Sequence, residues 1–163
     1  YRVGGLWHIN MIDEILHKAN IKTDELALKI KAKPYNIHKY YGDPAGKQVS
    51  GQSGMGDIEI FRRKGVVIHT KRDKISRSIS SGVSHLRSFI ENAENQRFLH
   101  IHEKCTGMME DLENYRYPEA KEGQDLKPEP LKDGYHDHGA DMIRYFFTNR
   151  FPIKNREFKV RTR

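Results

Sequence analysis

Short apolar runs alternate with amphipathic segments of helical periodicity along most of this 163-residue chain. The runs rich in β-branched and aromatic residues cover 1–9, 37–41, 66–68 and 98–101, which is typical of strands. Apolar residues recur at helical spacing over 11–31, 57–64, 78–93, 104–115 and 136–147. Strands that alternate with helices favour parallel pairing. We therefore expect an α/β fold with a central mixed, mostly parallel sheet flanked by helices.

Cap and turn residues set the expected ends of these elements. Thr23 is expected to cap a second helical piece within 11–31, and Asp57 to cap the helix that follows the Gly/Ser-rich loop. Gly65 is expected to end that helix. The stretch 118–134 is rich in Pro, Glu and Lys, and it is expected to form a loop.

The charge balance is basic. The chain has 29 Lys and Arg against 22 Asp and Glu, a formal net charge of +7, which indicates a polyanionic partner such as nucleic acid. Eight basic residues oppose one acidic residue between Phe61 and Ile90, whereas nine acidic residues oppose five basic ones over 102–133. A one-sided excess that flanks a Gly/Ser loop favours contact with phosphates over a solvated helix face.

Length and composition exclude several classes of protein. The chain is long enough for one domain but not for a motor together with a second catalytic domain, and we expect a domain over 1–149 followed by a basic tail over 150–163. No apolar run approaches the ~18 residues of a membrane span, so we expect no membrane association. A single cysteine, Cys105, allows no internal disulfide, and we expect a reducing cytoplasm.

Asp43 follows a predicted strand, in the segment Gly42-Asp43-Pro44-Ala45-Gly46. Ligands gather at the carboxyl ends of parallel strands, which favours a functional role. Asp-Pro-x-Gly is also a common type I turn, and this structural role is favoured unless a second carboxylate lies nearby. The loop resembles a phosphate-binding loop, but it has three residues between its glycines instead of four and Gln48 instead of Ser or Thr.

A second group of ionisable residues lies in the segment 136–141. Asp137, His138 and Asp141 occupy positions i, i+1 and i+4 of the predicted last helix, on the side away from its apolar stripe. Helix capping by Asp137 and a favourable interaction of Asp141 with the helix dipole would also explain them. Spacing alone leaves both interpretations open.

A zinc site is a competing interpretation. His100, His102 and Cys105, with His136 or His138, offer nitrogen and sulfur donors that zinc prefers. The usual Cys-x-x-Cys and His-x-x-x-His pairs are missing. Strand-end histidines beside a small buried thiol are therefore the favoured interpretation.

Three motifs, in this order, resemble the nuclease domain of the large terminase subunit of tailed bacteriophages. They are Tyr40–Gly46, Glu110–Tyr117 and His136–Tyr145, and the resemblance runs from about Tyr1 to Phe147. The most specific part is His-x-x-Asp followed by Arg-Tyr. The resemblance implies a ribonuclease-H-like, three-layer fold and a metal-dependent endonuclease that cuts concatemeric double-stranded viral DNA during genome packaging.

The resemblance also implies roles for individual residues. Asp43 resembles the family's second metal-binding carboxylate, at the end of a central strand, and Asp141 resembles the third, on the final helix. His138 matches the motif histidine, and Asp137 is an additional carboxylate in the same turn. The implied catalytic residues are Asp43, Asp141 and His138, and the implied metal ligands are Asp43, Asp141 and Asp137. Two Mg²⁺ or Mn²⁺ ions would activate water on one side of the phosphorus and stabilise the leaving oxygen on the other.

Further partners follow from the basic segment and from the resemblance. The candidates for contact with the DNA backbone are Lys47, Arg62, Arg63, Lys71, Arg72, Lys74 and Arg77. Contacts to phosphates alone imply low sequence specificity. The resemblance adds the ATPase domain of the same subunit, the small terminase subunit and the portal, in the host cytoplasm at the procapsid.

The chain departs from the family pattern at its start. The family's first catalytic Asp lies on the first strand, and residues 1–3 resemble the second strand, so that Asp and the ATPase motor are expected upstream of Tyr1. A catalytically incomplete DNA-binding module of the packaging motor is therefore one alternative function. A resolvase or transposase-type nuclease of the same fold is another, since fold does not select substrate.

Overall fold

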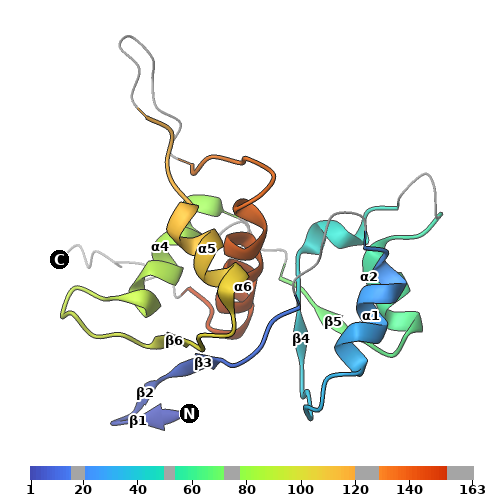
Figure 1. The fold of residues 1–163 in the computed structure, drawn as a ribbon, viewed down its shortest axis with the longest axis horizontal. Coiled ribbons are helices and arrows are strands. Elements are labelled where there is room, and N and C mark those ends of the chain that lie inside the picture. The colour runs from blue at the N-terminus through green and yellow to red at the C-terminus, as the bar shows by residue number, and fades with distance from the viewer. Residues whose placement is uncertain (16–20, 50–53, 72–77, 120–128, 154–163) are drawn as a thin grey trace, which may run out of the picture.

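A computed structural model describes residues 1–15, 21–49, 54–71, 78–119 and 129–153 (Figure 1). Its strands are β1 (Arg2–Val3), β2 (Leu6–Trp7), β3 (Ile9–Met11), β4 (Tyr40–Tyr41), β5 (Ile68–His69) and β6 (Leu99–Ile101). Its α-helices are α1 (Thr23–Lys31), α2 (Asp57–Arg63), α4 (Ile79–Ile90), α5 (Thr106–Asn114) and α6 (Asp137–Arg150). A short 3₁₀ helix, η1 (Pro44–Lys47), follows β4.

The strands pair as three two-stranded sheets within the described residues. β1 and β2 form an antiparallel hairpin whose turn residues, Gly4 and Gly5, have φ values of 56° and 81°. Positive φ at both turn positions matches the twist of the paired strands, and glycine adopts it without strain. β3 pairs in parallel with β6, and β4 pairs in parallel with β5.

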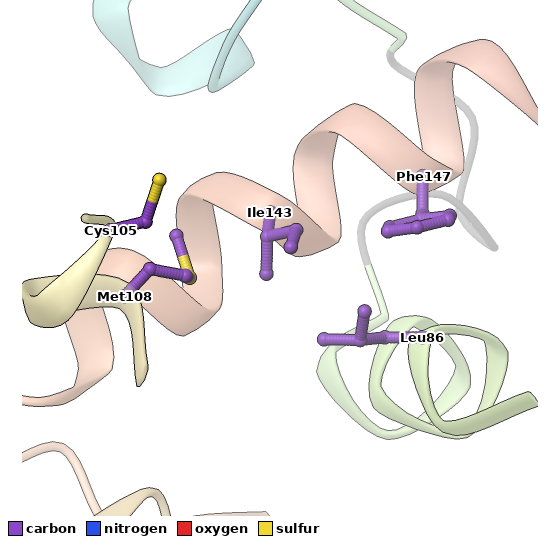
Figure 2. Packing of buried hydrophobic residues seen from close by; sticks show 5 residues of the cluster. All are labelled: Leu86, Cys105, Met108, Ile143 and Phe147. Carbon is purple, nitrogen blue, oxygen red and sulfur yellow. The ribbon is translucent and has the colours of Figure 1, made fainter. Parts of the chain in front are cut away.

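The larger hydrophobic core lies between α4, α5 and α6 (Figure 2). Its buried members are Leu86, Cys105, Met108, Ile143 and Phe147. Burial of a large apolar side chain contributes about 1.5–3 kcal/mol, so this cluster fixes α6 firmly against its two neighbouring helices. α6 also carries the polar motif that the sequence singles out.

A smaller core lies between α1, α2 and the β4–β5 pair, and it is built on Ala27, Phe61 and Val66. Figure 1 shows these elements on one side of the molecule and α4, α5 and α6 on the other. Tyr41 of β4 joins the two parts, because its ring packs edge-on against Phe146 of α6 with 5.9 Å between centroids. The carboxyl end of β4 is thereby placed beside α6.

The α/β class is confirmed, and two of the three sheets are parallel. The described residues do not form the predicted single central sheet. Their strands are only two or three residues long and pair as separate two-stranded sheets. The N–H of Gly42 still donates to the carbonyl of His69 at 3.2 Å, and β4 ends at the turn that Asp43 and Pro44 form, because Pro44 has no N–H to extend the ladder. The predicted strand at 66–68 is displaced to Ile68–His69.

The helical region predicted from residue 11 begins only at Thr23 in the described residues. Residues 9–11 pair with β6 instead, and the carboxylate of Glu14 accepts hydrogen bonds from the backbone N–H groups of Gly107 and Met108, each at 3.0 Å. Glu14 thereby satisfies two N–H groups that the first turn of α5 leaves without helical partners. A tertiary capping interaction has replaced a local helix.

The two predicted caps, Thr23 and Asp57, bond to each other: the Thr23 hydroxyl donates to Asp57 Oδ1 at 2.7 Å. Both lie inside their helices, where Lys22 and Gly56 occupy the N-cap positions, so the capping prediction is wrong for both residues. The prediction that Gly65 ends α2 is confirmed by its φ of 81°. The helices predicted over 78–93 and 104–115 are confirmed as α4 and α5.

None of the helices in the described ranges is long and apolar enough to cross a lipid bilayer. Residues 154–163, which make up most of the predicted basic tail, lie outside the described residues.

Candidate functional site

The three motifs that the sequence singles out converge on α6. Tyr40–Gly46 reaches it through the contact of Tyr41 with Phe146. The segment Glu110–Tyr117 reaches it through α5, which packs on α6. Residues far apart in the sequence therefore meet around one helix that carries Asp137 and Asp141.

Asp43 lies immediately after β4 and forms a turn. Its Oδ1 accepts a hydrogen bond from the N–H of Ala45 at 2.8 Å, and its carbonyl accepts one from the N–H of Gly46 at 3.2 Å. The turn interpretation is therefore confirmed, and Asp43 caps η1. The carboxylate is nevertheless exposed at the carboxyl end of a parallel strand, where it can take a further partner.

Asp43 also interacts with α6, through Tyr145. Burial raises the pKa of the Tyr145 hydroxyl, the Arg144 guanidinium lowers it, and the charge and hydrogen bonding of Asp43 raise it. Tyr145 therefore interacts with both Asp43 and Arg144, and Arg144 in turn binds Asp141. The structure thus connects Asp43 and Asp141 through two intervening side chains.

The two carboxylate oxygens of Asp141 have different partners. Oδ1 accepts from Nε and Nη2 of Arg144, at 3.1 and 2.9 Å. Oδ2 lies 3.5 Å from the ammonium of Lys132, whose side chain is 56% exposed. One oxygen is thus held by a buried guanidinium, and the other faces a solvated lysine that an incoming cation can displace.

Arg144 is 2% exposed, which is unusual for an arginine. Burial favours its neutral form, but the charge of Asp141 and the hydrogen bonds to it hold the pKa of the guanidinium above its usual range. The guanidinium carbon also lies 4.4 Å from the centroid of the Tyr145 ring. Its Nη1 is buried without a hydrogen-bond partner in the described part of the chain, so the polar cluster has unused donor capacity.

Asp137 is the first residue of α6 and is 7% exposed. Its Oδ1 is buried and has no hydrogen-bond partner among the described residues. A buried carboxylate oxygen without a donor is costly and calls for a water molecule or a cation. His138, the next residue, is exposed, so these two neighbours face different surroundings.

Asp111 is a further carboxylate beside the start of α6, and the sequence reasoning gave it no role. Its Oδ2 accepts a hydrogen bond from the N–H of Gly139 at 2.9 Å. Burial raises the pKa of Asp111, and the Gly139 N–H and the charges of His136 and His138 oppose that rise. A Cβ at position 139 would collide with this carboxylate, which explains the glycine. Asp111 lies inside the Glu110–Tyr117 motif, and this position is the sequence signal that could have identified it as a candidate.

The charges of both α6 carboxylates act on the hydroxyl of Tyr115. Burial raises the pKa of its hydroxyl to about 12, and the negative charges of Asp141 and Asp137 contribute to that rise. The hydroxyl therefore stays protonated near neutral pH. It can donate a hydrogen bond in the neighbourhood of the carboxylates but cannot act as a base there.

The donor chemistry of Asp43, Asp137 and Asp141 fits Mg²⁺ or Mn²⁺, since these hard cations prefer carboxylate oxygens. The buried Oδ1 of Asp137, which has no hydrogen-bond partner among the described residues, is suited to such a cation. Within the described ranges, however, no three His, Cys, Asp or Glu side chains lie close enough together to hold a metal ion. Mg²⁺ commonly binds through one or two carboxylates and completes its shell with water and substrate phosphates, so the residues present fit such an open site.

The proposed zinc donors are dispersed instead. Cys105 is buried, burial raises the pKa of its thiol, and its Sγ lies 3.9 Å from the carbonyl oxygen of Met11. His100 bonds to His8, with 3.1 Å between ring nitrogens, and His102 accepts from the N–H of Lys104. His136 bonds to Asp133 at 2.7 Å. The favoured interpretation, strand-end histidines and a small buried thiol, agrees with these contacts.

The predicted DNA contacts divide into three groups. Lys47 is exposed at the end of η1, the turn that Asp43 caps, and Lys71 is partly buried after β5. Arg62 and Arg63 both bind Glu59, at 2.8 and 3.2 Å, and they lower the pKa of Glu59 to about 2. Arg72, Lys74 and Arg77 lie outside the described residues.

Comparison of the chain with protein families, with curated proteins and with solved structures finds no match.

Proposed function

We propose that this chain is a metal-dependent DNA endonuclease domain that cuts double-stranded DNA by phosphodiester hydrolysis. The observation that carries the proposal is the position of Asp43. It lies exposed at the carboxyl end of β4 and interacts through Tyr145 and Arg144 with the carboxylate of Asp141 on α6. Oxygen donors from a strand end and a facing helix are suited to divalent cations bound to phosphates.

On this proposal, Asp43, Asp137 and Asp141 would hold the cations. The cations would supply an activated water molecule and charge stabilisation at the leaving oxygen. Arg144 keeps Oδ1 of Asp141 in a fixed orientation, because the arginine is buried and binds that oxygen twice. Displacement of the exposed Lys132 would free Oδ2. His138, exposed on the same helix, would orient water or the leaving group.

The basic residues would hold the substrate. Lys47 is exposed in the turn that Asp43 begins, so it is suited to a phosphate next to the one that is cut. Contacts of this kind position the duplex but do not read its sequence. The proposed enzyme therefore cuts with low sequence specificity.

The motif resemblance extends this proposal to a terminase large subunit. The domain would then have a ribonuclease-H-like fold, with the short parallel pairs β3–β6 and β4–β5 as parts of its sheet. It would act on viral DNA at the procapsid, in the host cytoplasm, together with an ATPase domain, a small subunit and a portal.

The proposal is tested by plasmid cleavage with Mn²⁺, with Mg²⁺ and with a chelator. Asp43→Asn and Asp141→Asn are expected to abolish metal-dependent nicking, while Asp24→Asn is the matched control, since Asp24 is exposed on α1 away from this cluster. A parent chain that never cuts in either metal would sink the proposal. Equal cutting by the parent and by Asp43→Asn would sink the assigned site.

A second candidate function is a DNA-binding module without chemistry. One observation favours it: Asp141 is already paired with Arg144 and Lys132, and the described carboxylates do not form a group of three. A parent chain that binds plasmid but does not cut it would support this alternative. Preferential cutting of branched over linear duplexes would instead favour a resolvase-type nuclease.

A further inference from the structure

Two arginines that are far apart in the sequence meet on the ring of Trp7. The guanidinium carbon of Arg2, in β1, lies 4.5 Å from the centroid of the indole ring. That of Arg150, the last residue of α6, lies 5.1 Å from the same ring. A cation over an aromatic face is held by the ring quadrupole, so the indole fixes both charges at one place on the surface.

Phe151 completes this arrangement. Its ring meets Trp7 edge-on, with 5.9 Å between centroids, and Arg150 lies 5.1 Å from it. A ring nitrogen of His85 lies 2.6 Å from the carbonyl oxygen of Phe151. The end of α6 is therefore attached both to the β1–β2 hairpin and to α4, which limits the motion of the two guanidinium groups.

Neither arginine has an acidic partner in the described part of the chain. Arg62, Arg63, Arg97 and Arg144 each bind an Asp or Glu. Arg2 and Arg150 are exposed, and no ion pair between described residues includes them. Two adjacent positive charges without a counter-charge repel each other, and an anion that bridges them would relieve that repulsion.

We infer that Arg2 and Arg150, held on Trp7, form a docking surface for the phosphate backbone of duplex DNA. Each guanidinium group can donate two parallel hydrogen bonds to the oxygens of a phosphate. Contacts of this kind are made to the backbone and do not read the bases. Binding here is therefore independent of sequence and depends strongly on salt.

The sequence that follows this surface supports DNA as its partner. Residues 154–163, which follow directly after it in the sequence, contain five Lys and Arg and only one acidic residue, Glu157. Asp141 and Arg150 lie on the same helix, about 14 Å apart along its axis at 1.5 Å per residue. Nine residues at 3.6 per turn also place the two residues half a turn apart around α6, so this surface is separate from the Asp141 cluster.

The inference takes its partner from the proposed function but does not require catalysis, so the two can fail separately. Binding of a fluorescent 30-base-pair duplex is measured with chelator present, at several salt concentrations, for the parent and for the double variant Arg2→Gln/Arg150→Gln. Arg97→Gln is the matched control, since Arg97 is exposed and paired with Glu91. Trp7 is the only tryptophan, so its fluorescence reports both folding of the hairpin and DNA contact.

The affinity of the double variant for the duplex is expected to be lower by about tenfold or more at low salt, and the slope of log K against log salt should fall by about two. Arg97→Gln should keep the affinity and the slope of the parent. DNA should also change the fluorescence of Trp7 in the parent. Arg2→Lys/Arg150→Lys should retain most of the binding, because charge is preserved. Unchanged affinity of a folded Gln double variant would overturn the inference, as would binding of the parent to phosphatidylserine vesicles but not to duplex. Asp43→Asn should lose cleavage but keep this binding.

Discussion

The side chain of Arg144 occupies the space where a side chain at Gly82 would lie. A Cβ at position 82 would come within 2.7 Å of Arg144 Cδ and 2.8 Å of Cγ. Gly82 lies in the first turn of α4, and Arg144 lies in the middle of α6. The absence of a side chain on one helix therefore allows an arginine of the other to be buried next to Asp141.

Gly82→Ala should destabilise the protein. Alanine is intrinsically better in a helix by about 1 kcal/mol, but forcing an extra methyl into a packed site costs about 1–3 kcal/mol, and the stem of Arg144 has no free space. We expect a net loss of about 0–2 kcal/mol in the free energy of unfolding, measured by urea titration. Ser84→Ala, at an exposed site of the same helix, is the control and should change little. A Gly82→Ala protein more stable than the parent would contradict the packing of Arg144.

The Arg144–Asp141 pair should show strong energetic coupling. Removing one partner of a buried pair leaves the other without compensation and typically costs about 3–5 kcal/mol, whereas exposed pairs contribute about 0–1 kcal/mol. A double-mutant cycle with Arg144→Met and Asp141→Asn should therefore give a coupling energy well above that of Arg97→Met and Glu91→Gln, an exposed pair. Equal coupling energies for the two pairs would show that Arg144 is not buried as described.

The His136–Asp133 contact should make stability depend on pH. The hydrogen bond to Asp133 raises the pKa of His136 above its ordinary value of about 6.5, and His136 holds the pKa of Asp133 well below its usual range. Because the folded-state pKa of His136 is raised, its contribution is fully present below the unfolded pKa and is lost as pH rises through the folded pKa.

The melting temperature of the parent should therefore exceed that of Asp133→Asn by more at pH 5.5 than at pH 8.5. Part of the difference should remain at high pH, since Asp133 Oδ1 also accepts from the backbone N–H groups of Tyr135 and His136, both at 2.8 Å. A difference that grows with pH would exclude the ion pair as its cause.

Glu59→Gln should strengthen binding of DNA. Glu59 neutralises one of the two positive charges on Arg62 and Arg63, and its removal frees both guanidinium groups for phosphates. We expect a few-fold tighter binding and a salt slope steeper by about one. Glu25→Gln, which removes the exposed partner of Lys29 on α1, is the control. If the two variants bind DNA equally well, α2 does not contact it.

Local signals in the sequence were sufficient for much of the secondary structure. Gly65 marks the end of α2, and apolar residues at helical spacing mark α4 and α5. These features depend on the conformation of a few neighbouring residues, and the residue types at those positions reveal it.

Long-range contacts account for what the sequence did not reveal. Residues 9–11 form a strand because β6, some 90 positions away, pairs with them, and Glu14 caps α5 across a similar separation. The burial of Arg144 depends on Gly82 in another helix. From its residue type alone, an arginine is expected to be exposed to solvent. The candidate carboxylates could be named from motifs, but their ion pairs with Lys132 and Arg144 required the fold.

The central claim is that Asp43 and Asp141 serve one metal-dependent site. Plasmid nicking with Mn²⁺ by Asp43→Asn, by Asp141→Asn and by the double variant tests it most directly, because residues that act as a unit have non-additive effects. The account predicts that the parent nicks, that each single variant loses this activity, and that the double variant is no worse than either one. A parent without metal-dependent nicking, or losses that multiply in the double variant, would contradict it.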